Sequence, residues 1–237
     1  MIVQSRFAEA SRVPVNDTLA KTPNVFVVDP DPLTGSLVND LLEGFNVMVH
    51  VYPSGRGFFA AYNEDQVGCL VLEQRIPDIS GLQIQQRLCA QNQRLPMVYV
   101  SSSWDISTAV AVMRRGAIHV LEKPLRSMEL LDAIQEGLAK DQKERRKLAE
   151  NRRVRESIAM LTQKERQLVS LIAATKSTKI ITAELGICAR AVELRRHAIM
   201  DKLGLDSSLE LIKFAMLAGR ECSDHFDSVD LPAEAAN

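Results

Sequence analysis

Five short apolar runs alternate with helical patterns in the first half of the chain, and this alternation constrains the fold more than any other feature. The runs occupy residues 24–28, 47–51, 69–72, 97–100 and 118–121. A continuous apolar run is typical of a strand that is buried on both faces of a sheet. Strands that alternate with helices form parallel sheets with helices on both faces. The sequence therefore predicts an α/β domain over residues 24–138, with a doubly wound five-stranded parallel sheet.

Polar residues stand where four of these runs end. They are Asp29, Glu73, Ser101 and Lys123. The carboxyl ends of parallel strands line the crevice in which open α/β sheets bind ligands. Carboxylates suit Mg²⁺, whereas lysine and serine donate hydrogen bonds to phosphate oxygens. Any one of these side chains could simply face solvent, but four in register favour a site for a metal ion and a phosphoryl group.

The segments VFVVDPDP, VLEQRIPDISGL and LEKPL, together with the serine after the fourth run, resemble a response-regulator receiver domain. The whole chain resembles a FixJ-type member of the LuxR/NarL response regulators. The resemblance implies an acidic pair that helps bind Mg²⁺, an aspartate that accepts a phosphoryl group, and a hydroxyl and a lysine that bind the phosphate. By position, Asp29 is the first acid, Ser101 the hydroxyl and Lys123 the lysine. A cis peptide bond is expected between Lys123 and Pro124.

The chain departs from the family pattern at two of these positions and at a third, which is aromatic in the family. Glu73 stands where the phosphoacceptor aspartate belongs. Pro30 replaces the second metal-binding acid, with Asp31 one place further on, and Val120 replaces an aromatic residue. A glutamate reaches one methylene farther than an aspartate, and a placement error of about 1 Å can lower a rate roughly a hundredfold.

The longer side chain of Glu73 also has a second consequence. Its carboxylate could pair with Lys123 without any modification. We therefore expect an atypical receiver that lacks a phosphoacceptor and is not switched by aspartyl phosphorylation. The competing interpretation is that Glu73 accepts a phosphoryl group nonetheless.

Basic residues are concentrated in the second half of the chain. The net charge is −1, yet residues 137–160 carry eight Lys or Arg against four acids, and residues 161–220 carry ten against six. An acidic region followed by a basic one indicates a regulatory domain joined to a nucleic-acid-binding domain. Residues 139–160 lack Gly and Pro and are rich in helix formers, which predicts a long linker helix. Its apolar residues are sparse, so two interpretations remain: a coiled coil with a second copy of the chain, or a solvated spacer.

A helical pattern fills residues 161–220. Thr162 and Glu165 have the spacing of a capping box, which starts a helix that runs to about residue 174. Helices are also predicted over residues 178–185, 189–203 and 207–218, and the last is expected to stop at Gly219. A short helix, a tight turn and a longer helix form a helix-turn-helix unit. The second helix of such a unit lies in the major groove of DNA.

The longer helix has an apolar face and a polar face. Val192, Ile199 and Leu203 fall on one side and are expected to pack into the domain. Arginines on the other side would neutralise DNA phosphates. The alternative is a plain four-helix domain whose arginines are only solvated.

The segments LTQKERQLVSLIA and VELRRHAIMDKLG resemble LuxR-type output domains. The resemblance implies three base-facing residues, which are Glu193, Leu194 and His197, and two phosphate-contacting residues, which are Lys179 and Arg196. Arg190 and Arg195 lie on the same polar side of the helix, where they would neutralise phosphates at its flanks. Thr175, Ala191 and Arg195 depart from the family pattern, so the resemblance does not carry over a preferred DNA sequence.

These observations predict five segments. They are a flexible extension (1–23), a receiver-like domain (24–138), a helical linker (139–160), a helix-turn-helix domain (161–220) and a flexible tail (221–237). We expect a cytoplasmic, homodimeric transcription regulator that binds promoter DNA and has no catalytic residue, cofactor, metal site or membrane segment. Four widely spaced cysteines indicate reduced thiols rather than a metal site. The alternative is a protein-interaction module, in which a partner protein acts through the pseudo-receiver to gate the DNA-binding domain.

Overall fold

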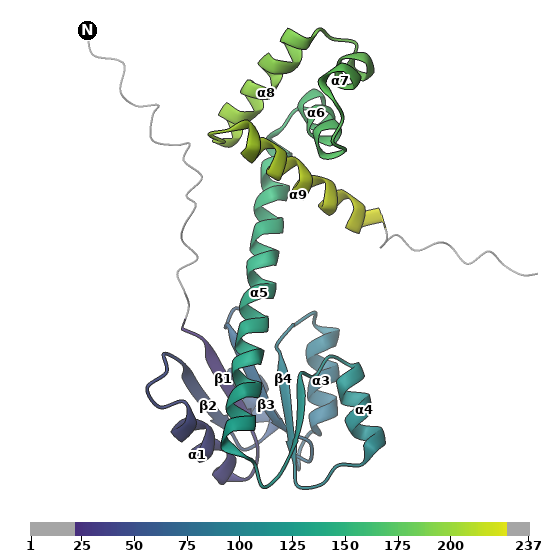
Figure 1. The fold of residues 1–237 in the computed structure, drawn as a ribbon. Coiled ribbons are helices and arrows are strands. Elements are labelled where there is room, and N and C mark those ends of the chain that lie inside the picture. Colours follow the sequence, from purple (N-terminus) through teal and green to yellow (C-terminus); the bar gives the residue numbers. More distant parts are fainter. Residues whose placement is uncertain (1–21, 227–237) are drawn as a thin grey trace, which may run out of the picture. The chain divides into compact units, whose positions relative to one another are not determined.

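The computed structural model describes residues 22–226, with side chains up to Arg220 (Figure 1). Most of the predicted extension (1–23) and tail (221–237) lies outside the described residues. The chain divides into two compact units, the first ending at Arg146 and the second beginning at Lys147. Within the described part, no helix is both long and apolar enough to cross a membrane.

The first unit is built on a parallel sheet of five strands. They are β1 (Asn24–Val28), β2 (Met48–Tyr52), β3 (Gly68–Glu73), β4 (Met97–Ser101) and β5 (His119–Glu122), in the spatial order β2-β1-β3-β4-β5. Every residue of β1, β3 and β4 is buried, as continuous apolar runs predict for the interior of such a sheet. The predicted doubly wound α/β fold is confirmed.

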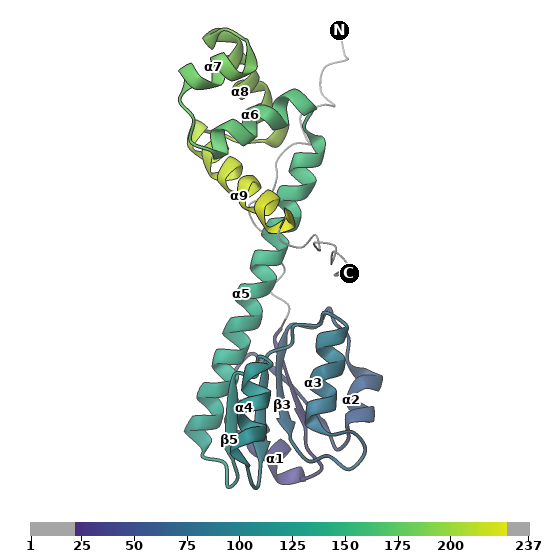
Figure 2. The same cartoon turned by 90° about the vertical axis from the view of Figure 1, so that its right-hand side faces the viewer.

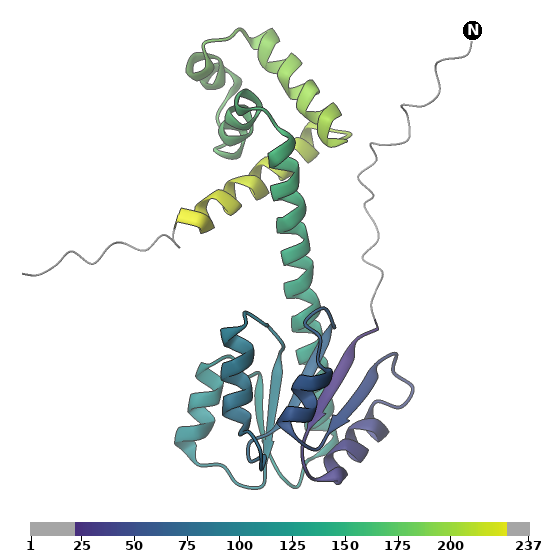
Figure 3. The same ribbon diagram turned by 180° about the vertical axis from the view of Figure 1, so that it is seen from behind.

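Helices cover both faces of this sheet. One layer consists of α2 (Gly55–Ala61), α3 (Gly81–Ala90) and α4 (Ile106–Arg114); the other consists of α1 (Pro32–Leu41) and the first turns of α5 (Ser127–Met160). Figure 1 views the first unit from the α1 and α5 side, and Figure 3 views it from behind. Figure 2 shows the sheet between α5 and the pair α2 and α3.

The alternation of side chains along each strand separates two cores. Phe26 and Leu70 face Phe58, Ile84 and their neighbours in the layer of α2, α3 and α4. Val27 and its neighbours on the opposite face pack against α1 and α5. The three middle strands are thus buried on both sides, and their carboxyl ends are left open for a site.

Helix α2 begins at Gly55, and both a neighbouring and a distant side chain bind its first turn. Ser54 is its N-cap and accepts the amide of Gly57. Asp78, from the loop after β3, accepts the amides of Gly55 and Arg56 at 3.1 and 2.8 Å. The amides of the first turn are therefore satisfied by the local cap Ser54 and by a partner 23 residues away in the sequence.

Helix α5 has no break at the predicted boundary between residues 138 and 139. Asp141 is buried and accepts the amide of Gly68 at the start of β3, 2.8 Å away. Arg145 donates to the carbonyl of Gln66 at 2.7 Å and to both oxygens of Asp141. The first turns of the predicted linker therefore pack on the sheet and belong to the first unit.

The second unit is all helical. After the last turns of α5 it contains α6 (Gln163–Ala173), α7 (Thr178–Leu185), α8 (Ala189–Leu203) and α9 (Ser208–Phe226). Thr162 and Glu165 form the predicted capping box at the start of α6. Leu168, Ile181 and Ile199 are at the centre of its core. The helix-turn-helix arrangement is present in α7 and α8.

Helix α9 does not stop at Gly219, contrary to the prediction. It continues to Phe226, and Gly219 keeps a helical conformation instead of the left-handed one that ends α7 at Gly186 and α8 at Gly204. A Cβ at Gly219 would lie 3.1 Å from the Cβ of Ala173 in α6. The glycine therefore permits close packing of two helices, which sequence alone does not distinguish from a stop signal.

Candidate functional site

The carboxyl ends of the strands meet at one edge of the sheet, and a cavity of about 250 Å³ opens there. It is lined by Asp29, Pro30, Asp31, Glu73, Arg75, Ser101, Ser102 and Lys123. All five residues predicted for the pocket lie in this cavity. Sequence reasoning missed Arg75 and Ser102 as lining residues, although each lies within two positions of a predicted one.

Lys123 joins the acids of this cavity. Its Nζ lies 2.7 Å from Oδ2 of Asp29, 3.0 Å from Oε2 of Glu73 and 3.9 Å from Oδ2 of Asp31. The side chains of Asp29 and Glu73 are 1% and 7% exposed, and that of Lys123 is 16% exposed. One ammonium is thus paired with two carboxylates almost entirely out of water, and Glu73 reaches it without modification.

The second oxygen of each buried acid is also bonded. Oε1 of Glu73 accepts the amide of Arg75 at 3.1 Å, and Oδ1 of Asp29 accepts the amide of Asp31 at 2.8 Å. Buried polar atoms are normally paired in this way, because an unpaired one loses its hydration without replacement. Both carboxylates are therefore held from two sides.

Burial and pairing act in opposite directions on Lys123. Burial alone would lower its pKa, because it disfavours the charged form. Hydrogen bonds to Asp29 and Glu73 and the negative charges of both acids outweigh burial, so the pKa lies above its ordinary value. Lys123 is therefore charged at any physiological pH.

The residues of this cavity do not fit the Mg²⁺ ion that the family pattern implies. Pro30 offers no ligand where the second acid of the pair belongs, and the ammonium of Lys123 already lies between the carboxylates of Asp29 and Glu73. A divalent cation at the same place would be repelled by that ammonium. Across the described side chains, no three His, Cys, Asp or Glu are arranged to hold a metal ion.

The rim of the cavity has two further features. The Lys123–Pro124 peptide is cis, as expected. Val120, at the position where the family has an aromatic residue, is half-buried. Trp104, in the loop after β4, packs edge-on against Tyr99 and donates its Nε1 hydrogen to the carbonyl of Leu121 at 2.9 Å. It ties that loop to β5, a role that sequence reasoning did not assign.

The polar face of α8 is the second candidate site. Val192, Ile199 and Leu203 are buried on its inner side, as predicted. The predicted DNA contacts lie on the remainder of the helix and on α7: Lys179, Arg190, Glu193, Leu194 and His197 are exposed, and Arg195 and Arg196 are half-buried. Leu194 is 63% exposed, so its side chain is accessible to a ligand.

Arg196 is held in place beside Glu193. Its Nη1 lies 3.1 Å from Oε1 of Glu193, and its Nε is buried without a hydrogen-bond partner among the described residues. A capping box and a partly exposed ion pair hold α6 and α8 together behind this face. Lys202 contacts Glu165 at 2.7 Å, and its hydrogen bond, with that of the Thr162 amide, lowers the pKa of Glu165 to about 2.

The comparison with known proteins bears on both sites. A model described as the response regulator receiver domain matches residues 25–135, and one described as bacterial regulatory proteins, luxR family, matches residues 159–215. The chain is 34% identical to the transcriptional regulatory protein TdiR of Thauera aromatica over 84% of this chain and 88% of that one. It is 31% identical to FixJ of Azorhizobium caulinodans over 82% of this chain and 92% of that one.

The chain belongs to the FixJ-like response regulators of the LuxR family. The solved structure of the response regulator StyR agrees, with a TM-score of 0.70 and 33% identity over 82% of this chain and 98% of that one. This regulator therefore controls transcription and binds DNA through its LuxR-type domain.

Proposed function

We propose that this response regulator acts without aspartyl phosphorylation. The observation that carries the proposal is the 3.0 Å contact between Nζ of Lys123 and Oε2 of Glu73. In the family pattern this lysine binds a phosphoryl group carried by an aspartate. Here a carboxylate supplies the negative charge permanently, and the Arg75 amide holds its other oxygen. The pocket thus carries a fixed ion network in place of a switch.

The DNA contacts follow from the exposed face of α8. In the major groove, a glutamate accepts a hydrogen bond from the amino group of cytosine, and an apolar side chain contacts the thymine methyl group. Glu193, Leu194 and His197 take the base-facing role. Lys179, Arg190, Arg195 and Arg196 take the phosphate role, which supplies affinity without sequence information. Double-stranded promoter DNA is the partner, which places the protein in the cytoplasm.

A homodimer would present two α8 helices to two half-sites of the DNA. An apolar stripe on α4 supports such an interface: Ile106, Val110 and Met113 follow helical spacing and are 85%, 45% and 44% exposed. In the alternative function, a partner protein would bind this stripe, and the pseudo-receiver would then gate the DNA-binding domain.

DNA affinity and oligomeric state test the proposal together. A DNA fragment is first selected with the wild-type protein from random sequence. Affinity and sedimentation are then measured for wild type, Glu73→Asp and Glu73→Ala, each with and without acetyl phosphate. Wild type is expected to bind as a dimer, equally well with and without the donor, and with a steep salt dependence. A donor-dependent gain in wild-type affinity would overturn the proposal, and binding that requires an added protein would favour the alternative.

A further inference from the structure

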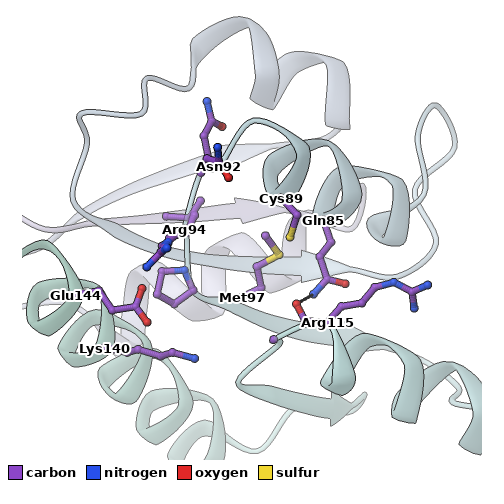
Figure 4. A pocket seen from close by; sticks show the side chains of 12 residues that line it. Gln85, Cys89, Asn92, Arg94, Met97, Arg115, Lys140 and Glu144 are labelled. Carbon is purple, nitrogen blue, oxygen red and sulfur yellow. Dashed lines mark hydrogen bonds between the residues drawn. The ribbon is translucent and has the colours of Figure 1, made fainter. Parts of the chain in front are cut away.

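A second cavity lies at the opposite edge of the sheet, where β4 and β5 begin. Its volume is about 350 Å³, and its floor is the buried segment Leu95, Pro96 and Met97 (Figure 4). Gln85 and Cys89 of α3 form one wall. Pockets that hold small molecules start at roughly this size and combine an apolar floor with a few polar groups.

Charged side chains from two directions border this cavity. Lys140 and Glu144 project from α5, and Arg94 lies across from them in the α3–β4 loop (Figure 4). None of these three makes an ion pair with another described residue. Arg115 also lines the cavity, but its side chain turns away and donates to the carbonyl of Ala111. The charges that face the cavity are therefore two cations and one anion.

The ends of α3 and α4 border the same cavity, and helix carboxyl ends disfavour anions. Here that effect is weakened because local amides already bond the last carbonyls. Gln91, Asn92 and Gln93 donate to α3, and Arg115, Gly116 and Ala117 donate to α4. The carboxyl ends of α3 and α4 therefore do little to offset the attraction of the two cations for an anion.

Gln93 provides an unused acceptor. It lines the cavity, and its Oε1 is buried with no hydrogen-bond partner among the described residues. A buried acceptor without a donor has lost its hydration without a replacement. A bound molecule that carries a hydroxyl or amine hydrogen would satisfy it.

The walls of the cavity are fixed before anything binds. Asp141 and Arg145 tie this turn of α5 to the start of β3, so the backbone at Lys140 and Glu144 has a set position. On the opposite wall, Gln85 accepts from the Tyr99 hydroxyl and donates to the carbonyl of Arg115. Pre-organised walls lower the ordering cost of binding.

We propose that this cavity binds a small organic anion that carries a carboxylate or phosphate together with a hydroxyl or amine. The anionic group lies between Arg94 and Lys140, and the donor reaches Gln93 or Glu144. The site lies at the end of the sheet opposite Glu73. Its test is therefore independent of the test of the proposed function.

Alkylation of Cys89 in the full-length protein tests the site directly. Cys89 lines the cavity and is an exposed free thiol, and Cys188 of the second unit is an exposed reference thiol in the same sample. Rates are read by peptide mass spectrometry with L-malate, glycerol phosphate or succinate at matched ionic strength. At ten times the dissociation constant, the hydroxylated anions are expected to slow Cys89 alkylation about tenfold and leave Cys188 unchanged. Succinate, which has no hydroxyl, is expected to protect less.

Two lysine variants separate a site from general charge effects. Lys140→Gln removes a cation of the cavity and is expected to abolish protection. Lys143→Gln removes an exposed cation of the same helix outside the cavity and is expected to keep it. Equal protection in Lys140→Gln, or no saturable protection by L-malate and glycerol phosphate up to about 10 mM, would overturn the proposal.

Discussion

Replacing Lys123 with methionine removes the ammonium that lies between Asp29 and Glu73 and leaves both carboxylates buried. The side chains of the acids are 1% and 7% exposed, so little water can take over the lost contacts. Removing one partner of a buried ion pair typically costs about 3–5 kcal/mol. Lys123 is 16% exposed, which places the expected loss at the lower end, about 3 kcal/mol.

Fluorescence of Trp104 measures this loss in the first unit alone, because it is the only tryptophan of the chain. Its ring packs on Tyr99 and is bonded to β5, so it reports the unfolding of the sheet. With a urea dependence of about 1–3 kcal/mol per M, a loss of about 3 kcal/mol lowers the midpoint by roughly 1–3 M. Lys143→Met, at an exposed position of the same unit, is the control and should stay within about 0.5 kcal/mol of wild type.

A double-mutant cycle with Glu73→Gln isolates the interaction energy between Glu73 and Lys123. Glu73→Gln alone keeps Lys123 paired with Asp29, so it should cost less than Lys123→Met. The interaction energy between positions 73 and 123 is expected to be about 1–3 kcal/mol. A value below about 0.5 kcal/mol would show that the 3.0 Å contact contributes nothing, and it would refute the fixed ion network.

The remaining predictions concern pH, packing and DNA. Because its folded-state pKa is raised, Lys123 contributes stability at every pH below the ordinary lysine value of 10.5. The difference in free energy of unfolding between wild type and Lys123→Met should therefore narrow only above that pH, which urea titrations at alkaline pH would measure. The pKa of Glu165 is lowered, so its carboxylate contributes stability above about pH 4.5 that is lost as the pH falls towards 2. Circular dichroism should therefore show that Glu165→Gln loses less helix than wild type when the pH is lowered through this range. A Cβ at residue 137 would overlap Sγ of Cys69, so Gly137→Ala should destabilise the first unit by about 1–3 kcal/mol in the Trp104 assay. The double variant Gly137→Ala, Cys69→Ala should recover part of this loss in stability. Arg196→Ala should weaken binding to all DNA sequences and lower the salt slope by about 1, whereas His197→Ala should change which sequences are selected; the reverse pattern would contradict the assigned roles.

Local signals in the sequence predicted most of the fold. Apolar runs located all five strands, and in β1, β3 and β4 burial on both faces leaves little room for polar side chains. The capping box of Thr162 and Glu165 located α6 because both of its hydrogen bonds are made within one turn. The pocket residues followed from one geometric rule, since parallel strands bring their carboxyl ends to one edge.

Contacts between distant segments could not be predicted from the sequence. Asp78 starts α2 and Asp141 binds Gly68, although these partners are 23 and 73 residues apart. Gly219 has the composition of a helix stop but serves the approach of α9 to α6. The pattern around Glu73 indicated that its carboxylate could reach Lys123; only the structure shows that the Arg75 amide holds the other oxygen. The cavity beside Lys140 had no sequence signal, because its residues come from four separate segments.

The phosphorylation state of the chain after treatment with acetyl phosphate tests the central claim most directly. Intact mass spectrometry is applied to wild type and to Glu73→Asp combined with Pro30→Asp, which restores the acceptor and the acidic pair of the family pattern. The fixed network of Glu73 and Lys123 predicts that wild type gains no phosphate under conditions that label the restored variant. A wild-type chain that gains one phosphate, lost on Glu73→Gln substitution, would contradict the account.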